Sequence, residues 1–296
     1  MDITPEPEGR VPVATGRERM IEVAVVQMAT RPYDAAAARA ASVCRLHEAF
    51  AAGADVVVLP ELIVPGYGVD AALVAGVAEP LDGPTVTAWA EVAAARGGLV
   101  VGGFAERDGP RLFNAAVAVS RDGVLLHYRK LHPFAAERCC FAEGDLGLPV
   151  AMTPWGAIGV CVCYDLRFVE TLRMLSLAGA ELVCVPTAWV AGFDAPNDAG
   201  PPPQAAAAIL QANLDQVYVA CSSQTGTPGN TRLLGGSLVA SPRGEVLAGP
   251  MVEGQMGASH VRIDLDDVMR SRTRGKGISP RKDRRPDVYG LGRAGL

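Results

Sequence analysis

Short apolar runs recur along the whole chain, and alanine-rich segments with a helical spacing of apolar residues lie between them. Continuous runs of this length, rich in Val, Ile and Leu, are typical of strands that are buried on both faces. We therefore expect strands at Ile21–Gln27, Val56–Leu59, Leu99–Phe104, Ala115–Val119, Ile158–Cys163, Leu182–Val185, Val217–Ser222, Ser237–Ala240 and His260–Ile263.

The helices are expected between these runs, at Ala35–Ala52, Thr85–Arg96, Val169–Ala178 and Gln204–Asp215. Alternation of strands and helices predicts an α/β fold. Glycine-containing turns at 121–123 and 242–244 add two hairpins. Because no break in composition marks a linker, the pattern indicates one domain.

One pattern occurs twice along the chain. A helix, a short acidic joint, an apolar run and a proline follow one another at 52–60, and again at 178–186. Both copies bring polar residues to the end of a buried strand, where open α/β sheets place their sites. The pattern fits either an internal repeat or two separate examples of a common helix-to-strand joint.

Composition narrows the classes of function. The chain has 296 residues, of which 49% are hydrophobic and 20% charged, and its formal net charge is −5. A chain of this size can bury a large core. No basic stripe is present that would neutralise many phosphates, which argues against nucleic-acid binding.

The ends and the cysteines suggest a cellular location. Residues 1–19 are polar and rich in Pro, Gly and Glu, so we expect a flexible leader rather than a signal peptide or an anchor. No apolar stretch approaches the roughly 20 residues that a membrane span needs. The seven cysteines are an odd number and several lie inside apolar runs, which favours reduced thiols in the cytoplasm.

Cys163 is the strongest candidate for chemistry. It ends an apolar run, and Tyr164 and Asp165 follow it before a helical pattern begins at Val169. At a strand-to-helix turn, unpaired backbone N–H groups are expected to lower the pKa of a thiol and to hold an oxyanion. Cys161 lies within the run and is expected to be a core side chain.

Two further motifs precede this cysteine in the chain. Leu59-Pro60-Glu61 ends another apolar run, and Tyr128-Arg129-Lys130 follows a strand-like stretch. With Cys163-Tyr164-Asp165 they give the order Glu, Lys, Cys. In these motifs the chain resembles the nitrilase, or carbon–nitrogen hydrolase, superfamily, and the resemblance extends from about Ile21 to Gly290.

The resemblance implies an architecture. It implies a four-layer α-β-β-α sandwich, with the carbon–nitrogen hydrolase domain at 20–275 and a C-terminal tail at 276–296 that contacts another subunit. Members of the superfamily dimerise through helices near the nucleophile. We therefore expect a homodimer or a larger even-numbered homo-oligomer.

The resemblance also implies roles for four residues. Cys163 is the nucleophile, and Glu61 is the base that takes its proton. Lys130 donates to the substrate oxygen as negative charge develops on it. Glu137 matches a second glutamate that positions the substrate and the lysine, although an acidic surface residue is the alternative. His132, two residues beyond the lysine, is expected to be structural.

Substrate contacts are expected beyond the strand ends. Tyr67, Trp189 and Phe193 suit the wall of a pocket, and packing in the core or at its rim is the alternative. Tyr164 directly follows the nucleophile. Arg167 either binds a substrate carboxylate or belongs to an ion pair inside the protein.

Together these features predict an amidase-type hydrolase that cleaves a small amide through a cysteine thioester. The alternatives are an N-carbamoyl amino acid amidohydrolase acting on ureido substrates and, less favoured by the Cys-Tyr-Asp motif, a nitrile hydrolase. No cofactor is expected. A metal is not expected either, because the pair Cys139-Cys140 has no second pair at ligand spacing.

Overall fold

The computed structural model describes residues 19–194 and 201–289. Its centre is a pair of six-stranded sheets. The first sheet has the order β14-β1-β2-β3-β4-β5 and consists of β1 (Met20–Gln27), β2 (Val56–Val58), β3 (Leu99–Asp108), β4 (Arg111–Ser120), β5 (Gly123–Arg129) and β14 (Gly257–Asp264).

The second sheet has the order β13-β12-β9-β8-β7-β6. It consists of β6 (Val150–Thr153), β7 (Gly156–Val160), β8 (Leu182–Thr187), β9 (Tyr218–Ser223), β12 (Leu238–Ala240) and β13 (Val246–Ala248). A small antiparallel pair joins β10 (Thr225–Gly226) and β11 (Leu233–Leu234). In each large sheet three central strands are parallel and the outer strands are antiparallel.

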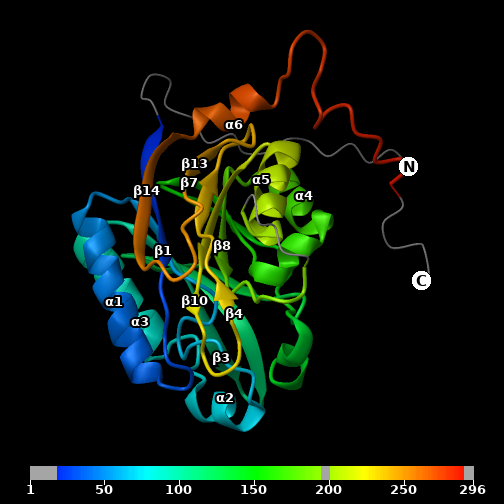
Figure 1. Ribbon diagram of the computed structural model, residues 1–296. Helices are drawn as coiled ribbons and strands as arrows, with labels where there is room; N and C mark the ends of the chain where they lie inside the picture. The colour runs from blue at the N-terminus through cyan, green and yellow to red at the C-terminus, as the bar shows by residue number, and fades with distance from the viewer. Residues whose placement is uncertain (1–18, 195–200, 290–296) are drawn as a thin grey trace.

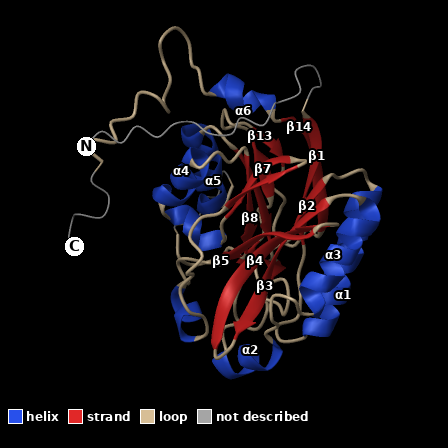
Figure 2. Ribbon diagram, turned by 180° about the vertical axis from the view of Figure 1, so that it is seen from behind, coloured by secondary structure: helices blue, strands red, loops and turns tan. Residues whose placement is uncertain are grey.

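Helices cover the outer face of each sheet. Helices α1 (Ala35–Ala51) and α3 (Pro84–Arg96) pack on the first sheet, and α4 (Val169–Leu177) and α5 (Pro203–Asp215) pack on the second. Figures 1 and 2 show the two sheets between the two helix pairs. The expected four-layer α-β-β-α sandwich is therefore confirmed.

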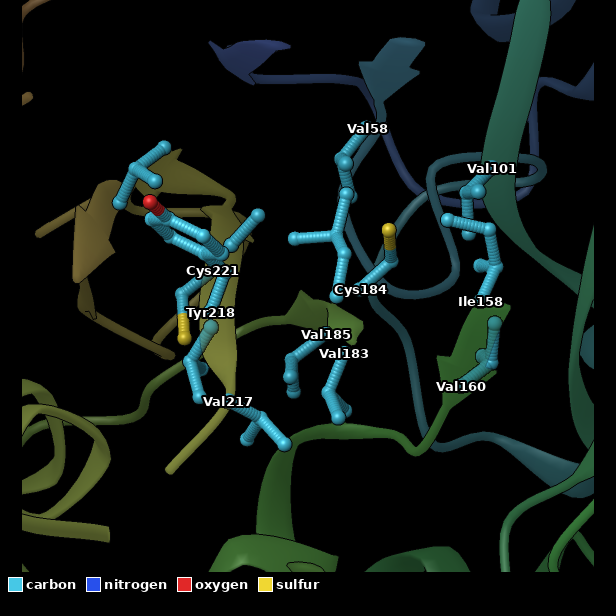
Figure 3. Packing of buried hydrophobic residues seen from close by; sticks show 14 of the residues in the cluster. Val58, Val101, Ile158, Val160, Val183, Cys184, Val185, Val217, Tyr218 and Cys221 are labelled. Carbon is cyan, nitrogen blue, oxygen red and sulfur yellow. The ribbon is translucent and has the colours of Figure 1, made fainter. Parts of the chain in front are cut away.

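Alternation along the strands explains the apolar runs. In β1, Val23 and Val25 lie in the core between the sheets, whereas Ala24 and Val26 lie in the core beneath the helices. Successive side chains of a strand point to opposite faces, so a strand with a core on both sides has no polar face. Figure 3 shows the same alternation in β8, where Cys184 points toward Val58 of the first sheet and Val183 and Val185 point to the opposite face.

All nine expected strands and all four expected helices are present within a few residues. No ranges were predicted for β5, β6, β10, β11 and β13, although the hairpin turns at 121–123 and 242–244 implied β5 and β13. The short helices α2 (Ala71–Val77) and α6 (Asp266–Ser271) were not predicted either. The sequence also placed the end of β7 at Cys163, whereas the strand ends at Val160. The expected leader at 1–19 lies almost entirely outside the described residues, as do residues 290–296 of the expected tail.

The pattern that occurs twice occupies equivalent places in the two sheets. After α1 and after α4, a glycine with positive φ ends the helix, at Gly53 and Gly179. The acidic residue that follows then accepts a hydrogen bond from the strand beside it: the Asp55 carboxylate from the backbone N–H of Glu22, and the Glu181 carboxylate from that of Ala157. The carboxyl ends of β2 and β8 therefore meet, and the backbone N–H of Glu61 donates to the carbonyl of Thr187 at 3.3 Å.

Candidate active site

Glu61 lies at this junction, three residues beyond the end of β2, and its side chain is fully buried. The segment that carries it packs directly on β3 at Gly103. A Cβ atom at Gly103 would lie 2.7 Å from the Cα of Glu61, so a larger residue there would displace the glutamate. The absence of a side chain at Gly103 thus helps to set the position of Glu61.

Lys130 and two glutamates form a buried charged cluster. The Lys130 ammonium lies 2.7 Å from Oε1 of Glu61 and 2.8 Å from Oε2 of Glu137. The Asn114 amide donates to both carboxylates, at 2.7 Å to Glu61 and 3.3 Å to Glu137. One cation therefore serves two carboxylates. Burial lowers the pKa of Lys130, but the negative charges of the two glutamates outweigh this effect, so the pKa is raised.

Glu137 is fixed from several sides. It lies in η1 (Ala135–Cys139), a 3₁₀ helix, and is fully buried. The hydroxyl of Tyr67 donates to its Oε1 at 2.7 Å, and the backbone N–H of Phe134 donates to its Oε2 at 3.1 Å. A surface role for Glu137, the alternative left open by the sequence, is excluded by this burial.

The two oxygens of Glu61 have different environments. Its Oε1 accepts from Lys130 and Asn114, whereas its Oε2 is buried with no hydrogen-bond partner. Burial, against the opposing charge of Lys130, raises the pKa of Glu61. A carboxylate with one unoccupied oxygen and a raised pKa is suited to accepting a proton.

Cys163 begins η2 (Cys163–Arg167), the 3₁₀ helix between β7 and α4. Its φ is +46°, in the left-handed region that L-residues adopt rarely, and strain of this kind concentrates at functional sites. Cys163 is half-buried, whereas Cys161 is fully buried in the main hydrophobic core. Cys161 is thus a core side chain, as expected.

Asp165 joins the cysteine turn to the segment that carries the lysine. Its buried carboxylate accepts from the hydroxyl of Tyr128 at 2.7 Å and from the backbone N–H of Val162 at 3.0 Å. It also lies 2.7 Å from Nδ1 of His132, whose ring stacks on Phe168 with 3.6 Å between centroids. His132 therefore has the structural place that the sequence predicted, since it holds Asp165 rather than the thiol.

The prediction that the helix start lowers the pKa of the Cys163 thiol is wrong. Burial first, and then the negative charge of Glu61, raise the pKa of Cys163 well above its ordinary value. Lys130 and the backbone N–H of Ala188 oppose this shift without reversing it. The helix that begins at the cysteine is a 3₁₀ helix of five residues with a small dipole, and desolvation of the thiolate outweighs that dipole. A thiol whose pKa is raised needs a base to take its proton.

Alkylation of Cys163 by iodoacetamide is expected to be slow at pH 7 and to rise about tenfold per pH unit to at least pH 9, because only the thiolate reacts. Mass spectrometry of the alkylated protein measures this rate. In Glu61→Gln the profile moves to lower pH, because one of the charges that raise the pKa is gone. A rate that already levels off between pH 6 and pH 8 would contradict the assigned direction.

A cavity of about 330 Å³ opens beside the nucleophile. Its wall combines Cys163 with side chains from η2, from the segment after β8, from the start of α5 and from Phe134. The lining residues are Phe134, Cys163, Tyr164, Leu166, Arg167, Ala188, Trp189, Val190, Phe193, Asp194, Gln204 and Ala207.

The predicted substrate contacts fall into two groups. Tyr164, Arg167, Trp189 and Phe193 line the cavity, so each is placed where a substrate contact would be. Tyr67 is not among the lining residues of this cavity, and its hydroxyl is occupied by Glu137. For Tyr67 the structure favours a role in positioning Glu137, and direct contact with substrate stays a prediction.

Four residues of the site carried no recognisable signal in the sequence. Asn114 lies inside β4, and Asp165 was quoted only as part of the cysteine motif. Asp194 forms an ion pair with Arg167, and Phe134 lines the cavity. Residues 195–200, which follow Asp194, lie outside the described residues.

Comparisons with known proteins agree with this geometry. A family model described as carbon-nitrogen hydrolase matches residues 22–273. The chain is 32% identical to a nitrilase of Pyrococcus abyssi over 265 residues, which cover 86% of this chain and 97% of the relative. It is 33% identical to an (R)-stereoselective amidase of a Pseudomonas species over 223 residues, which cover 74% and 76%.

Solved structures of an amidase from Nesterenkonia sp. AN1 are also similar. A double variant, with a glutamate and a cysteine replaced, is in complex with acrylamide; it has a TM-score of 0.73 and 26% identity, covering 88% of this chain and 96% of that one. In another variant the acetamide moiety of fluoroacetamide is bound covalently to the active-site cysteine; there the TM-score is 0.72 and the identity 25%, covering 90% and 97%.

Proposed function

Because the chain belongs to the carbon–nitrogen hydrolase family, we propose that it is an amidase that hydrolyses a small carboxamide through a thioester on Cys163 and releases ammonia or an amine. The observation that carries the proposal is that Oε2 of the buried Glu61 has no hydrogen-bond partner. The charges of Glu61 and Lys130 both affect the pKa of Cys163, which lines the cavity. A raised thiol pKa and a nearby free carboxylate oxygen form a nucleophile and base pair.

In the first half of the reaction Glu61 takes the proton of the thiol. Sγ of Cys163 then attacks the carbonyl carbon, a C–S bond forms, and the electron pair of the C=O bond moves to oxygen. When the tetrahedral intermediate collapses, the C–N bond breaks and the proton held by Glu61 passes to the leaving nitrogen. The products of this half are a thioester and ammonia or an amine.

In the second half water replaces the amine. Glu61 takes a proton from a water molecule while the water oxygen attacks the thioester carbon. The C–S bond then breaks and the acid is released. The sulfur leaves as thiolate and takes back the proton from Glu61. One residue thus moves a proton in both halves, which its raised pKa favours.

Lys130 and the backbone N–H groups near the cysteine would bind the oxyanion. The bond to Glu61 and the bond shared by the two oxygens of Glu137 use two of the three ammonium N–H groups. One N–H is left for the substrate oxygen. The backbone N–H of Tyr164, in the first turn of η2, has no carbonyl of the same helix to pair with and supplies a second donor.

Purified protein tested for ammonia release distinguishes the candidate reactions. We expect ammonia and the matching carboxylic acid from aliphatic and aromatic carboxamides. Ureido acids, the substrates of an N-carbamoyl amino acid amidohydrolase, and nitriles serve as the competing panels. Faster turnover of either panel than of every carboxamide would contradict the amidase proposal.

Chelation is expected to leave activity unchanged. In the described part of the chain, no three His, Cys, Asp or Glu side chains are grouped so as to hold a metal ion, and a thiolate needs no Lewis acid. Ammonia release is measured before and after dialysis against EDTA. Activity that is lost in EDTA and restored by zinc would contradict the expectation.

We expect a homodimer or a larger even-numbered homo-oligomer. Large apolar side chains are exposed on α4 and α5, among them Val169 and Leu210, and Ile278 is exposed in the tail. The tail is attached near these helices, because Arg281 donates to the carbonyl of Leu177 at 2.8 Å. Deletion from Gly275 onward should weaken both association and activity. Light scattering that shows a fully active monomer would overturn this assembly.

The cytoplasmic location and the absence of nucleic-acid and membrane partners stay predictions from the sequence. Among the described residues, the longest apolar helices fall short of what a bilayer crossing requires. All seven cysteines are free thiols, which supports a reducing compartment.

A further inference from the structure

Charge is confined to one part of the cavity. Arg167 and Asp194 are the charged side chains among the lining residues, and the rest of the wall is apolar, aromatic or uncharged. Arg167 lies four residues after the nucleophile in the same short helix, whereas Asp194 follows Trp189 in the segment after β8. Two segments therefore deliver one cation and one anion to the same cavity.

The two side chains pair with each other. A terminal guanidinium nitrogen of Arg167 donates to the carboxylate of Asp194. Within the described residues neither group has another ionic partner, so the pair is balanced in charge. Both side chains are partly exposed, at 39% and 23%, so the pair adds little to stability and a substrate can reach both groups.

The neighbouring wall fixes Asp194 from one side. Phe193 packs edge-on against Phe134 with 4.6 Å between ring centroids, and Phe134 contacts Tyr164 at 5.0 Å. The polar group nearby in the lining is Gln204, whose Oε1 is buried with no hydrogen-bond partner. Among the described residues the wall thus offers aromatic surface and uncharged polar groups, but no unpaired positive charge.

From this arrangement we propose that Asp194 sets the charge selectivity of the site. By occupying Arg167 it restricts the enzyme to carboxamides whose acyl side is uncharged, and it excludes amides that carry a carboxylate. This inference rests on the proposed amidase function and names the substrate class for it. The sequence left open whether Arg167 binds substrate or forms an ion pair inside the protein. In the structure it forms an ion pair with Asp194, and this pair lies in the wall of the cavity.

The physical basis is competition for one guanidinium. A substrate carboxylate must either displace Asp194 from Arg167 or lie near a like charge, and both cost free energy in a partly desolvated cavity. An uncharged acyl group meets neither cost. Removal of the Asp194 charge frees Arg167 to bind a carboxylate with charge-assisted hydrogen bonds.

The experiment compares glutaramide with glutaramate, which have the same length and differ in one terminal charge. The net charge of this pair of side chains is 0 in the wild type and +1 in Asp194→Asn. It is −1 in Arg167→Gln and again 0 in the double variant. Glu48→Gln, which breaks an exposed ion pair with Arg45 on α1, is the matched control. For each protein kcat/KM is measured on both substrates.

We expect the wild type to prefer glutaramide at least about tenfold. In Asp194→Asn this preference falls at least about tenfold, through a lower KM for glutaramate, because the freed arginine binds its carboxylate. In Arg167→Gln the preference rises, and in the double variant it returns toward that of the wild type. Glu48→Gln keeps the wild-type ratio.

A second readout does not depend on amide hydrolysis. Alkylation of Cys163 by iodoacetate relative to iodoacetamide should rise in Asp194→Asn and fall in Arg167→Gln. If no protein releases ammonia but this ratio follows the charge of the pair, the amidase proposal fails and the selectivity stands. If ammonia is released and both ratios are the same in all variants, Asp194 has only a structural role and the inference is overturned.

Discussion

Cys163→Ala is expected to abolish turnover, whereas Cys161→Ala is expected to keep most of it. The two cysteines are two residues apart, but only Cys163 lines the cavity, and Cys161 is fully buried in the hydrophobic core. Without the sulfur nothing forms the covalent intermediate, so the loss should reach the detection limit of an ammonia assay. Cys161→Ala removes one buried sulfur and should lower the melting temperature rather than kcat.

The comparison is matched, because both variants remove a thiol from the same segment. Comparable activity in the two variants would show that the nucleophile is assigned to the wrong residue. Circular dichroism of Cys163→Ala, expected to match the wild type, separates a lost nucleophile from a lost fold.

The second large effect concerns Glu61. Glu61→Gln should lower kcat by a hundredfold or more, which corresponds to roughly 3 kcal/mol in the chemical step. Glutamine keeps the shape and can still accept a hydrogen bond from Lys130, but it cannot take the proton that a thiol of raised pKa must lose. Lys130→Met should have a similar effect through loss of the donor to the oxyanion.

Asp215 offers a control for this test. It is another buried carboxylate, 2.8 Å from the Nε of Arg173, and lies at the end of α5 outside the cavity lining. Asp215→Asn should change the melting temperature and leave kcat close to the wild-type value. Near-normal rates in both Glu61→Gln and Lys130→Met, with unaltered KM, would contradict the Glu-Lys-Cys assignment.

The strands and helices were predictable because burial on both faces leaves a visible pattern. Val56–Leu59 has core on either side, so it reads as a continuous apolar run. The hairpin turn at 242–244 implied β13, but its range was not predicted, since Val246 and Leu247 are exposed at the edge of the sheet. The end of β7 was placed too late because Val162 donates to Asp165 instead of pairing with a strand, which the apolar run does not reveal.

The candidate site was predictable only where local motifs mark it. Glu61, Lys130 and Cys163 each end a strand-like run, whereas Asn114 lies inside a strand and has no local signal. The pKa of the thiol was predicted in the wrong direction, because the rule for helix starts is local and burial depends on the whole fold. The pairing of Arg167 with Asp194 likewise depends on a loop that the sequence could not place.

Mass spectrometry of the acyl-enzyme tests the central claim most directly. The enzyme is quenched in acid during turnover of a slow carboxamide and digested with trypsin. The expected peptide spans residues 139–167 and carries Cys139, Cys140, Cys161 and Cys163, so fragmentation must locate the adduct. We predict the mass of the acyl group on Cys163 alone, removed by hydroxylamine as expected for a thioester. Turnover without any adduct, or an adduct on one of the other three cysteines, would contradict the proposed mechanism.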